Sequence, residues 1–191
     1  MRTGMKLAIG VGTVGLFAMG VGGVKNMVGP TGEPQAVDAS MFVGGGMDAP
    51  GIDISTTVNA PAADVYKTFT TSAGWQKFLE AETAIDLRVG GPWEIYFNPE
   101  TKIGSNGCQV LSYVPNEMVS FSWNTPPKFA DERAKRTWVV VTFADAGAGK
   151  TAVRLRHLGF TNEGKWPEVK TYFTNAWPNV LKGLAESYNQ K

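Results

Sequence analysis

The chain has 191 residues, of which 43% are hydrophobic and 18% charged, as is usual for a globular protein large enough to form one domain with its own core. Its 18 basic and 17 acidic residues leave a net charge of +1, and this balance gives no reason to expect nucleic acid as a partner. With one cysteine, Cys108, and one histidine, His157, the sequence excludes an intramolecular disulfide and a metal site built from several thiolates or imidazoles. We therefore expect no metal and no cofactor.

The N-terminal part resembles a targeting segment. Arg2 and Lys6 precede an uncharged, glycine-rich stretch over 7–24, so we expect residues 1–24 to be a signal peptide or a weak N-terminal anchor, with possible membrane association through residues 7–24. An exported or periplasmic protein follows from this interpretation, and a cytoplasmic location is the alternative. Glycines and prolines then predict a flexible linker over 25–50.

The folded domain is expected over 51–191. It begins with an alternating strand over 52–58, followed by two short helices over 62–69 and 72–79. Alternating apolar residues then predict strands one after another, at 85–88, 93–98, 107–113, 119–124, 137–143 and 151–158. Between them, the proline-rich and charged segment 125–135 is too long for a hairpin turn, and long loops of this kind are often functional. We expect the loop over 125–136 to control entry to a ligand site.

A long amphipathic helix is predicted over 166–190. Its apolar residues recur every three or four positions: Val169, Phe173, Ala176, Trp177, Val180, Leu181, Leu184 and Tyr188. Pro178 lies inside this run and is expected to kink or interrupt it. Because the strand connections are short, the sequence predicts an α+β domain in which a curved antiparallel sheet of about six to seven strands wraps the C-terminal helix.

This order of elements resembles the START-like superfamily, also called SRPBCC or helix-grip. Within it, the chain is similar to the family of heat-shock-protein-90 ATPase activator homologues. The motifs that carry the resemblance are Asn59-Ala60-Pro61 with Val65-Tyr66, Trp75, Gly90-Gly91-Pro92-Trp93, residues 107–115 with Phe121-Ser122-Trp123, residues 151–160, and Trp177 with Leu181 and Leu184. The resemblance implies a groove between helix and sheet that takes hydrophobic small molecules, and it makes a chaperone partner possible. The export-like N-terminus departs from family members that act on a cytosolic chaperone.

Two glycine-rich motifs suggest nucleotide binding but lack its structural context. Residues 10–15 match a dinucleotide fingerprint, yet no series of alternating strands and helices follows. Residues 144–151 match a relaxed phosphate loop, but the alternation from Thr151 onward predicts a strand where that loop needs a helix. We interpret the second motif as a hairpin turn.

The predicted ligand site consists of inward-facing apolar residues and the histidine. Its members are Trp75, Phe78, Trp93, Ile95, Phe97, Phe121, Trp123, Leu155, His157, Phe173, Trp177 and Leu181. The same side chains could equally fill the core, and His157 could be a general base, a group that orients a ligand together with Tyr172, or a histidine with its hydrogen bonds satisfied inside the core. Arg154 and Arg156 are expected on the outer face, and Cys108 is expected to be a buried structural thiol.

Three functions are compatible with this pattern. The first is binding of a small hydrophobic or amphipathic ligand in a cavity between the sheet and the C-terminal helix, with no catalytic residue assigned. The second is a protein-interaction module like the chaperone ATPase activator. The third is a cyclase- or hydratase-type enzyme, which needs a pair of polar groups at the cavity.

Overall fold

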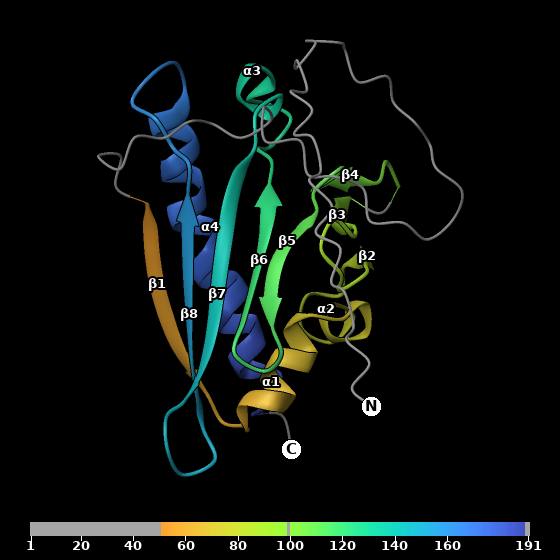
Figure 1. Ribbon diagram of the computed structural model, residues 1–191. Helices are drawn as coiled ribbons and strands as arrows, with labels where there is room; N and C mark the ends of the chain where they lie inside the picture. Colours follow the sequence, from red (N-terminus) through yellow and green to blue (C-terminus); the bar gives the residue numbers. More distant parts are fainter. Residues whose placement is uncertain (1–50, 99, 190–191) are drawn as a thin grey trace, which may run out of the picture. The chain divides into compact units, whose positions relative to one another are not determined.

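The computed structural model describes residues 51–98 and 100–189, so the expected signal segment over 1–24 and the linker over 25–50 lie outside the described residues (Figure 1). In chain order the elements are β1 (Ile52–Val58), α1 (Ala62–Phe69), α2 (Ser72–Leu79), β2 (Glu82–Ile85), β3 (Trp93–Asn98), β4 (Ile103–Gly104), β5 (Val110–Val114), β6 (Met118–Trp123), α3 (Ala130–Arg133), β7 (Thr137–Asp145), β8 (Thr151–Leu158) and α4 (Trp166–Glu186).

The main sheet has five antiparallel strands in the order β1-β8-β7-β6-β5. The first strand in the chain, β1, pairs with the last, β8, so that Ile52 lies opposite His157 and Val58 opposite Thr151. The alternation of buried and exposed residues along β8 and β7 puts one face of the sheet on the core, as a half-buried antiparallel sheet requires. Val139, Val141 and Phe143 face inward on β7, and Trp138 is half-buried on the other face.

A second, smaller sheet contains β2, β3 and β4, where the sequence predicted a single sheet. The two sheets meet at an isolated bridge between Pro92 and Gln109, and the amide of Trp93 donates to the carbonyl of Cys108 over 2.8 Å. The amide of Val110 donates to the carbonyl of Gly91 at 2.9 Å on the other side of this bridge, and the amide of Gly90 donates to the carbonyl of Val110 at 2.8 Å. The pairing is therefore limited to this short stretch and does not continue as a ladder between two strands. The separation therefore occurs at Gly90-Gly91-Pro92, which the sequence marked only as a turn.

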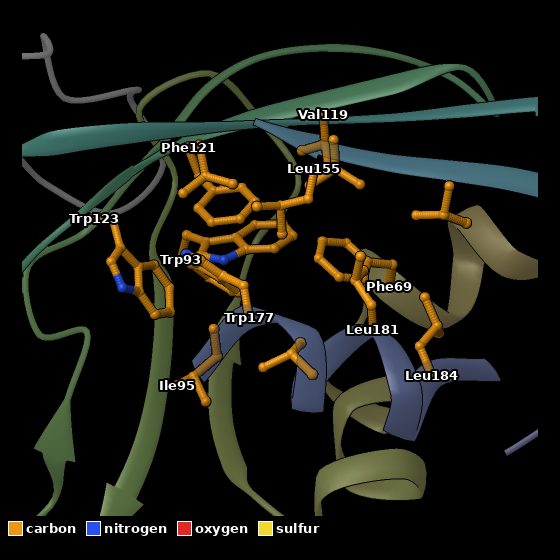
Figure 2. Packing of buried hydrophobic residues seen from close by; sticks show 14 of the residues in the cluster. Phe69, Trp93, Ile95, Val119, Phe121, Trp123, Leu155, Trp177, Leu181 and Leu184 are labelled. Carbon is orange, nitrogen blue, oxygen red and sulfur yellow. The ribbon is translucent and has the colours of Figure 1, made fainter. Parts of the chain in front are cut away.

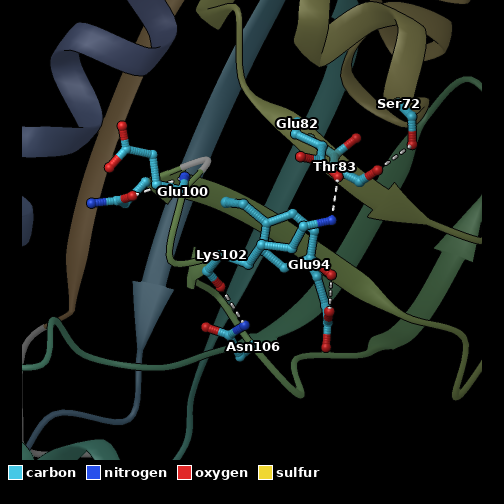
Figure 3. Close-up of polar contacts among 9 residues, drawn as sticks. Ser72, Glu82, Thr83, Glu94, Glu100, Lys102 and Asn106 are labelled. Atoms are coloured by element: carbon cyan, nitrogen blue, oxygen red, sulfur yellow. Dashed lines mark hydrogen bonds and ion pairs between the residues drawn. The ribbon is translucent and has the colours of Figure 1, made fainter.

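Polar side chains fasten the small sheet at its edges (Figure 3). Lys102 pairs with Glu82 across the sheet at 2.8 Å, and Ser72 at the start of α2 donates to the carbonyl of Thr83 at 3.4 Å. The amide side chain of Asn106 donates to the carbonyl of Lys102 at 2.8 Å, which closes the turn after β4. These contacts give the two-residue strand β4 a fixed place beside β3.

The long helix α4 crosses the inner face of the main sheet and packs against β1 and α2 (Figure 1). It runs unbroken through Pro178, so the proline does not interrupt it. Its buried residues are Trp166, Val169, Phe173, Trp177, Val180, Leu181 and Leu184. Six of the eight predicted stripe residues are among them. Ala176 is only half-buried, and Tyr188 is half-buried beyond the end of the helix, which stops at Glu186 and not at 190.

Large side chains fill the space between α4 and the main sheet (Figure 2). The rings of Trp93 and Phe121 stack with centroids 4.2 Å apart, and the ring of Phe69 lies 6.1 Å from Trp93 and 6.4 Å from Phe121, measured between centroids. Leu155, Leu181 and Leu184 complete the packing toward the helix. An open pocket lies beyond this packed region, toward the small sheet. The α+β helix-grip architecture expected from the sequence is confirmed, with the strands divided between two sheets.

Candidate ligand-binding pocket

A pocket with a volume of about 350 Å³ lies between α4, the end of β6 and the small sheet. This size is at the lower end of the range for small-molecule sites. The residues that line it come from α2, β3, β4, β6 and the segment after it, α3 and α4. They are Leu79, Phe97, Ile103, Gly104, Trp123, Asn124, Thr125, Pro126, Pro127, Arg133, Tyr172, Phe173, Ala176, Trp177, Asn179 and Val180.

The helix contributes a second stripe, turned slightly away from the core. Tyr172, Phe173, Ala176 and Val180 lie on neighbouring turns of α4, so the edge of the buried stripe becomes a wall of the pocket. Phe173 and Trp177 belong to both surfaces, since they are almost fully buried and also line the pocket. Tyr172 lies farther out and is 40% exposed.

The opposite wall comes from the small sheet. Alternation on β3 puts Trp93, Ile95 and Phe97 on one face, but β3 extends beyond the packed core, so Phe97 is 57% exposed while the other two are fully buried. The ring of Phe97 meets Trp123 edge to face with centroids 6.3 Å apart, and Trp123 lies 5.0 Å from Trp177. The pocket is therefore bounded on two sides by aromatic rings.

The segment after β6 supplies the polar wall. The buried side chain of Asn124 donates to the carbonyl of Asn106 at 3.1 Å, and the buried hydroxyl of Thr125 donates to the carbonyl of Phe129 at 3.1 Å. Arg133 on α3 donates to the carbonyls of Thr125 and Gly104, the latter at 2.9 Å. Burial, followed by the neighbouring charge of Arg136, lowers the pKa of Arg133 from its usual value.

The structure brings four of the twelve predicted site residues to the pocket: Phe97, Trp123, Phe173 and Trp177. The other eight lie elsewhere in the core. Seven of them pack between sheet and helices without lining the pocket: Trp75, Phe78, Trp93, Ile95, Phe121, Leu155 and Leu181. Their inward orientation was predictable, but they fill space where a cavity was expected.

His157, the eighth, is fully buried in a structural hydrogen-bond network. The indole of Trp177 donates to its Nδ1 at 2.9 Å, so the neutral ring carries its proton on Nε2 and donates to the hydroxyl of Thr137 at 2.7 Å. That hydroxyl in turn donates to the carbonyl of Trp123 at 3.1 Å. Both ring nitrogens are thus occupied by protein groups, which matches the interpretation of His157 as a satisfied core histidine rather than as a ligand-orienting group or base.

Several pocket residues escaped the sequence analysis. Leu79 and Asn124 are the last residues of a predicted helix and a predicted strand but were not assigned to the site, and Ile103 lies between two predicted strands. Residues 125–127 and Arg133 belong to the long loop that was expected to be functional, but no single residue of it was predicted to line the site. The tandem prolines at 126–127 were a further signal in this loop, because they mark a rigid segment directly after a strand.

Other kinds of site find little support in the described part of the chain. No group of three or more histidine, cysteine, aspartate or glutamate side chains is placed to hold a metal ion among residues 51–98 and 100–189. Over the same residues, no helix is long and apolar enough to span a membrane. Cys108 is buried, and burial raises the pKa of its thiol to about 12. Residues 146–150 form the turn between β7 and β8, with Thr151 at the start of the strand, so the phosphate-loop motif is a hairpin.

Comparison with known proteins places the chain in a family. The family model described as activator of Hsp90 ATPase homolog 1-like protein matches residues 59–188. No curated protein is a significant match to the sequence.

Solved structures share the fold at low sequence identity. The Aha1 dimer from Colwellia psychrerythraea has a TM-score of 0.57 and 18% identity, covering 72% of this chain and 95% of the other. A protein from Mesorhizobium loti has a TM-score of 0.56 and 17% identity, covering 73% and 96%. An HSP90 activator from Plasmodium falciparum has a TM-score of 0.53 and 18% identity, covering 68% and 88%. The family resemblance read from the sequence is confirmed by the family model, whose match extends over more than half of the residues, and the chain therefore belongs to the family of activator of Hsp90 ATPase homolog 1-like proteins.

Proposed function

We propose that the domain binds a small hydrophobic or amphipathic molecule in the pocket between α4 and the small sheet. The observation that carries the proposal is the exposure of large apolar side chains around an open pocket. Phe97, Ile103 and Tyr172 are 57%, 41% and 40% exposed, and all three line it. Monomeric proteins seldom leave such a group of apolar side chains in water unless the site has an occupant.

Binding comes mainly from burial of apolar surface, at about 25 cal/mol per Å² removed from water. The rigid aromatic walls favour this, because Trp123 and Trp177 are already held by their neighbours and lose little freedom when a ligand enters. The segment 125–136, expected to control entry, forms one wall, and the ring of Tyr172 packs against it, with its centroid 6.5 Å from that of Phe129.

The test is ligand titration of the full chain followed by tryptophan fluorescence and thermal unfolding. Two of the six tryptophans, Trp123 and Trp177, line the pocket, so an occupant changes their emission. With 1-decanol, decanoate and 4-phenylbutyrate as probes, we expect saturable binding in the micromolar range by at least one probe and a rise in melting temperature. If none of them shows saturable binding below about 1 mM, the pocket is not a site for this class of molecule.

The affinity of the variant Phe97→Ala tests whether the ligand binds in this pocket. This side chain is largely exposed without ligand, so its loss changes the free energy of unfolding by no more than about 0.5 kcal/mol. It removes an aromatic wall from the bound state, so we expect affinity to fall about tenfold. Val89→Ala is the matched control, because Val89 is 50% exposed and does not line the pocket. Equal affinities for the two variants would place the binding site elsewhere.

A second candidate rests on the family match. We propose chaperone binding as the alternative, because the family model is described by its likeness to an activator of an Hsp90 ATPase. Stimulation of the ATPase activity of an Hsp90-type chaperone by the full chain, retained when Phe97 is replaced by alanine, would favour this alternative over the ligand-binding function.

A further inference from the structure

Arg133 brings a positive charge to the pocket without a negative charge to balance it. Its guanidinium donates to the carbonyls of Thr125 and Gly104 and, at 3.3 Å, to the side-chain oxygen of Asn106. All three acceptors are neutral. A guanidinium has five N–H donors, so two are left without a partner among these acceptors, on a side chain that lines the pocket.

The surroundings add to this charge. The guanidinium of Arg136 donates to the carbonyl of Asn106 at 3.1 Å and to that of Arg133 at 3.3 Å, and its Nε is buried without a partner. At the mouth, the ammonium of Lys128 lies 5.1 Å from the ring centre of Tyr172. None of the ion pairs within residues 51–98 and 100–189 includes these three cations.

Carboxylates are present nearby but do not face the pocket. Glu132 is buried beside Arg133 in sequence, yet its Oε1 accepts from the amide of Lys165 at 2.9 Å. Asp131 is exposed, and no residue that lines the pocket is acidic. A partly buried arginine with only neutral acceptors is costly, and an anion in the pocket removes that cost.

From these observations, which rest on the proposed ligand-binding function, we infer that the natural occupant is an amphipathic organic carboxylate. Its apolar part lies between Phe97, Trp123 and Trp177, and its carboxylate accepts hydrogen bonds from the free donors of Arg133. One arginine faces the pocket, which matches a single negative charge. A phosphate monoester carries a charge of about −1.5 to −2 and three strong acceptor oxygens, and needs more donors than this wall supplies.

A matched series of ten-carbon probes tests the inference on the full chain. Decanoate, 1-decanol and decylammonium share one tail and differ only in the charge of the head group. We expect decanoate to bind at least tenfold more tightly than 1-decanol and decylammonium to bind most weakly, with the advantage of decanoate shrinking as salt rises. Saturable binding of 1-decanol with no advantage for decanoate overturns the inference and leaves the proposed function intact. If none of the three binds, and 4-phenylbutyrate does not bind either, both the inference and the proposed function are overturned.

Two charge-removing variants show which arginine is responsible. Arg133→Met is expected to cost decanoate at least tenfold in affinity and to change 1-decanol binding by less than threefold, while Arg133→Lys recovers part of the loss. Arg156→Met removes the same charge from the exposed outer face of β8 and is expected to leave both affinities unchanged. Equal losses for Arg133→Met and Arg156→Met overturn the assignment, since they reflect only the net charge. If Arg133→Met fails to fold, the head-group series with the unaltered chain decides.

Discussion

At the scale of single residues, His157 shows how a titratable group can serve structure alone. The indole of Trp177 and the hydroxyl of Thr137 fix its tautomer, and burial lowers its pKa to about 3. A histidine with this pKa stays neutral at any physiological pH and cannot exchange protons with a ligand. Its role is to connect α4, through Trp177, to β7 and β8.

The pKa of His157 predicts a pH-dependent stability. In the unfolded chain the imidazole titrates near its ordinary value of 6.5, whereas in the folded chain it titrates near 3. Between these values the unfolded chain binds a proton that the folded chain does not, so the free energy of unfolding falls as pH falls from about 6.5 toward 3. The slope from this group reaches about 1.4 kcal/mol per pH unit and vanishes above pH 6.5.

Urea denaturation of the unaltered chain and of His157→Gln between pH 4 and 7.5 measures this slope. Glutamine keeps a hydrogen-bonding side chain but does not titrate, so the variant is expected to lose less stability on acidification. Carboxylates contribute equally to both chains and cancel in the difference. Parallel pH profiles would contradict the assignment of a neutral, buried imidazole.

At the scale of secondary-structure elements, α4 contains a proline, Pro178, in its interior, where proline normally destabilises a helix. Pro178 is exposed and has no amide hydrogen, so the turn that it belongs to lacks one backbone hydrogen bond. We expect Pro178→Ala to raise the free energy of unfolding by about 1–3 kcal/mol, as measured by chemical denaturation. Thr174→Ala, on the exposed face one turn earlier, controls for helix propensity and is expected to change stability by less than about 0.7 kcal/mol. A loss of stability with Pro178→Ala would show that the proline ring sets the path of α4.

Element boundaries show what periodicity can and cannot predict. Strands β1 and β8 begin and end where alternation predicted, because the more buried and the exposed side chains alternate along all seven and eight residues. The four-residue β2, the two-residue β4 and the single turn α3 are too short to show a period. Residues 82–85 were therefore missed, and the strand was expected at 85–88.

The site was less predictable than the fold, and Leu155 and Phe97 show why. Alternation identifies the inward-facing side of each strand, β8 for Leu155 and β3 for Phe97, but not that Leu155 lies in the packed core whereas Phe97 extends beyond it and lines the pocket. Arg133 could not be predicted as a pocket residue for another reason. Its partners Gly104 and Asn106 are 29 and 27 residues away in sequence, and only the fold brings them together.

At the scale of the whole described domain, the buried thiol of Cys108 reports on unfolding. The side chain is fully buried, and burial raises its pKa to about 12, so little thiolate exists in the folded state and reagents cannot reach it. We expect a thiol reagent such as Ellman's reagent to label the native protein only through opening of the core. Cys108 is the only cysteine in the chain, so each labelling event is read without ambiguity.

Labelling rates are therefore expected to follow stability. A stabilisation of about 1.4 kcal/mol slows labelling tenfold when opening is global and fast compared with the reaction. Pro178→Ala should slow it accordingly, and a saturating pocket ligand should do the same. If labelling is fast and neither Pro178→Ala nor the ligand changes its rate, the reagent reaches Cys108 through a local opening near the small sheet.

Strand β3 contributes both to the buried core and to the rim of the pocket, and this has a practical consequence for engineering. Trp93 and Ile95 hold the strand in the interior, while Phe97, Ile103 and Tyr172 stand in water around the opening. Randomised libraries confined to positions 97, 103 and 172 can thus retune which guest is accepted without eroding the scaffold's capacity to fold, and directed evolution of new binders is best started there.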